Sequence, residues 1–180
     1  DNVDWLAPYL ALREDLARGA YASYAAELVD RFAAQGDEDY QSVFALLDST
    51  LDRLCSDSEP RLVMRYFEVH LLDLVGFRPE LTECVVSRDD IQAEDQFFSY
   101  GLGGIVTPGY AHEGVATVPI SMMALKLLRH IQRSPYSQVK ALQIPAPVHH
   151  EVERIVLGYI TYLLERRLQS VDFIRRVRQF

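Results

Sequence analysis

The middle of the chain constrains the fold most, because a strong helical pattern there gives way to short segments punctuated by glycine. Over 61–75, apolar residues recur at helical spacing, which predicts an amphipathic helix that ends at Gly76. Its apolar face consists of Val63, Phe67, His70 and Leu74. Residues 82–118 break this period, and short extended segments are expected at 84–86, 97–100 and 104–107. The patterns predict a mainly α fold, a helical bundle with a small strand-containing insert.

The insert contains two pairs of residues with the spacing of a four-cysteine zinc ribbon. Cys84 and Ser87 form the first pair, and Thr107 and Tyr110 follow after a gap of 19 residues. Only Cys84 can supply a thiolate, so the other three positions lack the soft ligands that such a site needs. We therefore expect a degenerate zinc knuckle without metal or other cofactor. Packing is expected to hold it together, through Ile105, Val106 and Tyr110.

The same region resembles bacterial RecO, a family of recombination mediators in DNA repair. The family's helix and the segments after it match at Glu59, Pro60, Leu62, Arg65, Phe67, Glu68, Leu71, Leu72, Gly76, Phe77, Pro79, Glu80, Leu81, Cys84, Gly103 and Gly104. Weaker similarities occur at both ends, at Tyr24, Glu27 and Leu28 and at Leu168, Ser170 and Phe173. The chain departs from zinc-bearing members at the other three metal positions.

This resemblance implies a binding protein of the bacterial cytoplasm, associated with the nucleoid. The implied partners are the acidic, phenylalanine-ended tail of single-stranded-DNA-binding protein, RecR, and DNA. Family members carry an amino-terminal OB-fold, which would contact most of the DNA and which nothing in this chain matches. Because the chain does not begin with methionine, we expect a fragment or a processed product.

Five residues are the candidates for binding the acidic tail. In proteins of this family the tail docks on the helical carboxyl-terminal domain, and an acidic peptide with a free carboxylate needs an apolar pocket rimmed by basic side chains. Arg65 matches a family arginine and is expected to share an outward stripe with Arg61, Glu68 and Leu72. Lys126 and Arg129 are expected on the outer face of a second helix. The partner-binding prediction is therefore Arg61, Arg65, Leu72, Lys126 and Arg129. Arg65 is expected to contribute most to tail binding, and Lys126 and Arg129 less.

Charge is distributed unevenly along the chain. Residues 1–60 carry 4 basic and 13 acidic side chains, whereas residues 121–180 carry 10 and 4. With a net charge of −8, the chain is expected to bind nucleic acid only weakly, through its basic last third. No apolar run approaches the roughly 18 residues of a membrane span, and no signal peptide is visible. Cys55 and Cys84 are expected to be reduced cytoplasmic thiols.

Helical periods continue on both sides of the insert. Helices are expected at 5–16, 17–34, 40–55, 61–75, 122–133 and 148–168, with a turn near 137–142. Ser121 is expected to cap one helix and Ser170 a short final one. His70 is expected to be a hydrogen-bonded core histidine. The domain division is 1–81 for the first helical part, 82–118 for the insert and 119–180 for the second helical part.

No catalytic motif is present, so we do not expect an enzyme. The sequence lacks metalloprotease, nucleophile-elbow and phosphate-loop patterns, and Gly101, Gly103 and Gly104 are expected to be turn glycines. The alternative is the small-molecule-binding effector domain of an all-helical regulator. The glycine-rich middle opposes that alternative, because such domains lack it.

Overall fold

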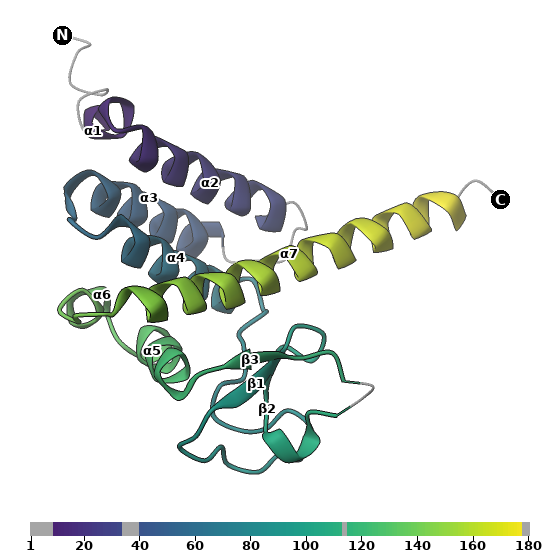
Figure 1. Cartoon of the computed structure of the whole chain (residues 1–180). Coiled ribbons are helices and arrows are strands. Elements are labelled where there is room, and N and C mark those ends of the chain that lie inside the picture. The colour runs from purple at the N-terminus through teal and green to yellow at the C-terminus, as the bar shows by residue number, and fades with distance from the viewer. Residues whose placement is uncertain (1–8, 34–39, 113–114, 178–180) are drawn as a thin grey trace, which may run out of the picture. The chain divides into compact units, whose positions relative to one another are not determined.

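The computed structural model describes residues 9–33, 40–112 and 115–177. Within these ranges it consists of helices and one small antiparallel sheet (Figure 1). The helices are α1 (Leu10–Glu14), α2 (Leu16–Ala33), α3 (Tyr40–Ser56), α4 (Pro60–Leu74), α5 (Met122–Arg133), α6 (Tyr136–Val139) and α7 (Ala146–Val177). The strands are β1 (Gln96–Ser99), β2 (Gly104–Val106) and β3 (Val118–Ile120), with a 3-10 turn η1 (Pro108–Tyr110). The predicted fold class, mainly helical with a small strand-containing insert, is confirmed.

Contacts divide the described residues into two compact units. The helical unit comprises those of Asp1–Arg78 and His130–Pro145, and the sheet unit comprises those of Pro79–Arg129 and Ala146–Phe180. The sheet thus shares its unit with α7. The division along the sequence at 81/82 and 118/119 stays a prediction.

Helix α4 is the core of the helical unit, where α2, α3 and α4 pack on one another. Its buried residues occur on all sides of the helix: Leu62, Val63, Met64, Arg65, Phe67, Glu68, Val69, Leu71 and Leu72. A helix buried all round needs neighbours on more than one face. The expectation of a single apolar face was therefore wrong, and Arg65 and Glu68 lie inside instead of on an outward stripe.

Two local signals set the ends of α4. Pro60 begins the helix, where its fixed φ and missing N–H suit the first turn. At the other end the Phe77 N–H donates to the Leu72 carbonyl at 2.7 Å, and the Gly76 N–H donates to the Asp73 carbonyl at 3.2 Å. This is a Schellman motif, and Gly76 supplies the left-handed residue it requires with φ of 80°. The observed helix is displaced by one residue at each end from the predicted 61–75.

The other helices follow the sequence pattern, with the main differences in the first and the last helix. Residues 5–8 of the predicted first helix lie outside the described residues, and α1 ends before Asp15. The Asp15 carboxylate accepts hydrogen bonds from the Ala17 and Arg18 N–H groups and so caps α2. Helix α7 runs without a break to Val177, so the separate final helix after Ser170 was wrong. An interior serine lowers helix propensity only slightly, and no proline interrupts the segment.

The sheet has the order β2-β1-β3, with Phe97 opposite Val106 and Pro119. Phe98, Ile105 and Ile120 form its buried face. Strand β3 was not predicted, and the predicted extended segment 84–86 is instead a tight turn. The turn is closed by the Arg88 N–H donating to the Cys84 carbonyl at 2.9 Å, with Arg88 at φ of 67°.

Candidate functional site

The knuckle region brings Cys84 and Thr107 together. The backbone on both sides of Cys84 hydrogen-bonds to the outer edge of β2: the Ile105 N–H donates to the Glu80 carbonyl at 2.9 Å, and the Val85 N–H donates to the Ile105 carbonyl at 2.8 Å. Gly104 permits this approach, because a Cβ there would lie 2.6 Å from the Glu80 carbonyl oxygen. The first and third positions of the former ligand pattern are therefore neighbours.

Hydrogen bonds surround the Cys84 thiol. Its Sγ lies 3.5 Å from the Thr107 backbone nitrogen and 3.6 Å from Thr107 Oγ1. Burial alone raises the pKa of Cys84, but hydrogen bonds from the backbone and side chains of Ser87 and Thr107 outweigh it and lower the pKa to about 6. Three of the four knuckle positions thus meet at one sulfur atom.

The fourth position, Tyr110, lies in η1 and is 41% exposed. Ile105 and Val106 are fully buried, so the expected packing of the knuckle holds for them and was wrong for Tyr110. Among the residues that the structure describes, no group of three or more His, Cys, Asp or Glu side chains could hold a metal ion. Only one thiolate, that of Cys84, is available among the four knuckle positions Cys84, Ser87, Thr107 and Tyr110.

Arg65 is engaged inside the helical unit. Its side chain is 4% exposed, and that of Glu68 is fully buried. Arg65 Nη2 donates to Glu68 Oε1 at 2.9 Å, and Nε lies 2.8 Å from Oε2. The Tyr24 hydroxyl also donates to Glu68 Oε1, at 3.0 Å. The Arg65 guanidinium, which matches the family arginine, is therefore paired with the Glu68 carboxylate of the same helix.

The other four candidate tail-binding residues differ in exposure. Arg61 is exposed on α4, whereas Leu72 is buried in the core. On α5, in the sheet unit, Lys126 is exposed. Arg129 is half-buried, and its Nε donates to the Leu81 carbonyl at 2.6 Å. Arg61 and Lys126 are the two candidates whose side chains are exposed.

Two further predictions are confirmed. His70 Nε2 lies 3.0 Å from the Ile131 carbonyl oxygen, and burial lowers the pKa of this imidazole. The Ser121 hydroxyl accepts the Ala124 N–H at 3.2 Å and so caps α5. Ser121 is in turn held by Glu151, whose carboxylate accepts its N–H and its hydroxyl at 2.7 and 2.6 Å. No sequence signal indicated that second interaction.

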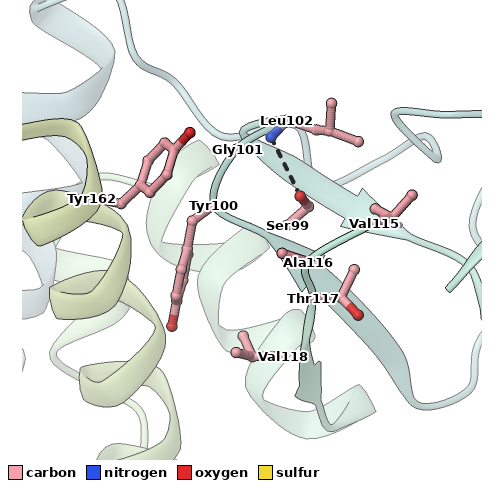
Figure 2. A pocket seen from close by; sticks show the side chains of 9 residues that line it. All are labelled: Ser99, Tyr100, Gly101, Leu102, Val115, Ala116, Thr117, Val118 and Tyr162. Carbon is pink, nitrogen blue, oxygen red and sulfur yellow. Dashed lines mark hydrogen bonds between the residues drawn. The ribbon is translucent and has the colours of Figure 1, made fainter. Parts of the chain in front are cut away.

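Sequence reasoning also missed a hollow of about 410 Å³ in the sheet unit. Figure 2 shows it between the turn after β1, the segment leading into β3, and Tyr162 of α7. Its lining consists of Ser99, Tyr100, Gly101, Leu102, Val115, Ala116, Thr117, Val118 and Tyr162. These residues come from three segments that are separated in sequence, so no local pattern indicated the hollow.

Comparison with known proteins decides the family. Residues 13–172 match the sequence model described as "Recombination protein O C terminal". The chain belongs to this family. It is 36% identical over 168 residues to a DNA repair protein RecO of Roseiflexus sp. (strain RS-1), covering 93% of this chain and 59% of that protein. It is 31% identical over 170 residues to a DNA repair protein RecO of Dehalococcoides mccartyi (strain ATCC BAA-2100 / JCM 16839 / KCTC 5957 / BAV1), covering 94% and 66%.

A third relative, the DNA repair protein RecO of Symbiobacterium thermophilum, is 30% identical over 179 residues, covering 98% of this chain and 71% of that protein. The chain thus spans about two thirds or less of the first two relatives' length. No helix among the described residues is long and apolar enough to cross a membrane.

Proposed function

We propose that this chain is the helical part of a RecO recombination mediator that acts in DNA repair. It binds the acidic tail of single-stranded-DNA-binding protein and RecR, and so helps to load strand-exchange protein onto coated single strands. The family match over 13–172 carries this proposal. The chain acts by binding, not as an enzyme, and most DNA contacts belong to an OB-fold outside it.

The chemistry of the tail selects the residues to test. Aspartates and a terminal carboxylate favour arginine and lysine, and a terminal phenylalanine favours an apolar neighbourhood. Arg61 and Lys126 are exposed and can meet a peptide directly. Arg65 and Leu72 support the α4 surface from inside. Arg129 is held by Leu81 and contributes mainly general positive charge.

Fluorescence anisotropy with a labelled tail peptide tests this proposal. A charge-assisted contact contributes about 1.5–3 kcal/mol, so Arg61→Ala is expected to weaken binding about tenfold or more, and Arg61→Lys to recover part of the loss. Lys126→Ala should have a smaller effect that added salt screens. Absence of wild-type binding at high micromolar protein would reject tail docking for this chain.

Arg65→Ala belongs in the same series, with its folding checked first by circular dichroism. An effect on binding that Arg65→Lys does not restore, in a variant that remains folded, would assign Arg65 a part in recognition. RecR is tested separately by size-exclusion chromatography of the mixture. If the chain forms a complex with RecR but does not bind the peptide, only RecR binding would support the mediator function.

A further inference from the structure

The hollow in the sheet unit begins where the β1–β3 ladder ends. The last registered pair is Phe98 with Val118, and beyond it the two segments line opposite sides of the hollow (Figure 2). The turn after β1 is fixed by the Leu102 N–H donating to Ser99 Oγ at 3.3 Å and by the Gly103 N–H donating to the Ser99 carbonyl at 2.9 Å. On the side of β1 the hollow is therefore bounded by hydrogen-bonded backbone.

Its walls suit a flat, weakly polar group. Tyr162 contributes a half-buried ring, and its hydroxyl lies beside the turn after β1, where a Cβ at Gly101 would be 3.4 Å from the hydroxyl oxygen. Tyr100 is fixed against α7 at Gly158. Leu102 is 52% exposed at the rim, and Thr117 adds a hydroxyl.

Basic side chains lie on both sides of Tyr162 along α7. Arg154 is exposed, and its Nη2 donates to the Pro119 carbonyl at 3.1 Å, next to the lining residue Val118. Arg166 is exposed four residues after Tyr162. The two arginines are separated by about 18 Å along the helix axis, from a rise of about 1.5 Å per residue. Glu165 is the acidic residue nearest to Tyr162 in sequence on this stretch of α7.

We propose that this hollow binds one base of single-stranded nucleic acid, which stacks on Tyr162 while its flanking phosphates lie along α7 near Arg154 and Arg166. Every base has a π-face, so aromatic rings beside positive charge bind single strands with little sequence preference. The spacing of the arginines suits a few nucleotides, with the ring between them. This site goes beyond the proposed function, which assigns DNA to a part outside the chain, and it does not depend on tail binding.

The test is anisotropy of a fluorescein-labelled oligothymidylate with the whole chain at low and moderate salt. Wild type is expected to bind weakly, with affinity falling steeply as salt rises. Tyr162→Ala should lower affinity about tenfold, from the loss of one stacked base, whereas Tyr162→Phe keeps the ring and should bind like wild type. Arg154→Gln and Arg166→Gln should each weaken binding and flatten its salt dependence. Arg13 is exposed on α1 in the helical unit, and Arg13→Gln should leave oligonucleotide binding unchanged.

Several results would overturn the proposal. The first is that the wild-type chain does not bind the oligothymidylate at low salt. The second is that Tyr162→Ala and Tyr162→Phe bind it equally well. Equal competition by duplex and single strands would mean contact with phosphates alone. If Tyr162→Ala loses the acidic tail peptide and keeps the oligonucleotide, the hollow is a peptide site instead. Circular dichroism of both Tyr162 variants establishes that each is folded.

Discussion

Arg65 and Glu68 form a buried ion pair whose two members depend on each other. The carboxylate is fully buried and accepts the guanidinium fork as well as the Tyr24 hydroxyl. Removing one partner of a buried pair leaves a charge without compensation. We expect Arg65→Ala to lower the free energy of unfolding by about 3–5 kcal/mol, measured by urea denaturation.

Arg61→Ala is the matched control, because Arg61 lies on the same helix with its side chain exposed. Its free energy of unfolding is expected to change by no more than about 0.5 kcal/mol. Equal denaturation midpoints for Arg65→Ala and wild type would show that the pair contributes nothing to stability. The two variants together separate the structural role of α4 from any role in binding.

Cys84 links stability to pH. Its folded pKa is about 6, below the roughly 8.5 of an ordinary cysteine in the unfolded chain. The unfolded state therefore holds more protons between these values, so the stabilising contribution of Cys84 is fully present above the unfolded pKa and is lost as pH falls through about 6. Wild-type stability should rise across this window relative to Cys84→Ser, measured by urea denaturation under reducing conditions.

Thr107→Val tests the cause of that shift, because it removes the hydroxyl that lies 3.6 Å from Cys84 Sγ. The pKa of Cys84 should rise in this variant, followed by thiolate absorbance. Cys55→Ser is the control. Burial raises the pKa of Cys55 first, and the Asp52 charge adds to that effect, so its loss should leave the low-pH titration unchanged. An unchanged Cys84 pKa in Thr107→Val would contradict the assignment.

The Tyr100 side chain, next to the end of β1, packs against α7 at Gly158. A Cβ at Gly158 would lie 2.5 Å from Tyr100 Cζ, so the ring occupies a notch that only glycine leaves open. Alanine is favoured over glycine in a helix by about 1 kcal/mol, but overpacking costs about 1–3 kcal/mol. Gly158→Ala is expected to lower the melting temperature through displacement of Tyr100.

Gly109→Ala is the comparison for that variant, since a Cβ at Gly109 would meet nothing within 4 Å. Its melting temperature should stay close to that of wild type. A Gly158→Ala protein that melts like wild type or higher would show that Tyr100 moves aside without cost. A second substitution, Tyr100→Leu, should then reduce the penalty if the clash is real.

The bounds of single helices were predictable where apolar spacing or a capping residue within the helix marks its ends. Apolar spacing placed α3 and α5 within a residue of their observed ends, and Ser121 and Gly76 marked a helix start and a helix end. The burial of Arg65 and Glu68 was not predictable, because it depends on neighbours that cover a second face of α4. The turn at Cys84 depends on bonds to β2, and such long-range pairing leaves no local pattern.

At the scale of the whole chain, the resemblance in sequence identified the family before any geometry, and the match over 13–172 confirmed it. The residues of the hollow could not be predicted, since they come from three separated segments. The tail-binding residues stay a prediction. Motifs that recur at fixed spacing are therefore visible in one sequence, whereas surfaces assembled from distant segments are not.

The knuckle gives a prediction for the intact protein. A structural zinc site needs four ligands that hold the metal together, and Cys84, already surrounded by Ser87 and Thr107, is one thiolate. Purified protein should contain no stoichiometric zinc by elemental analysis, and a chelator should leave its melting temperature unchanged. About one zinc per chain, or melting on chelation, would contradict this.

The reciprocal experiment restores cysteine at Ser87, Thr107 and Tyr110 together. Cys84 and Thr107 already meet, and Ser87 hydrogen-bonds to the same thiol, so three of the four thiolates would start close together. Tyr110 is exposed and must turn inward. The variant should take up about one zinc per chain and melt lower after chelation, because metal binding energy is folding energy. Failure to bind zinc would mean that η1 no longer presents the fourth position, so that the knuckle has lost its geometry as well as its ligands.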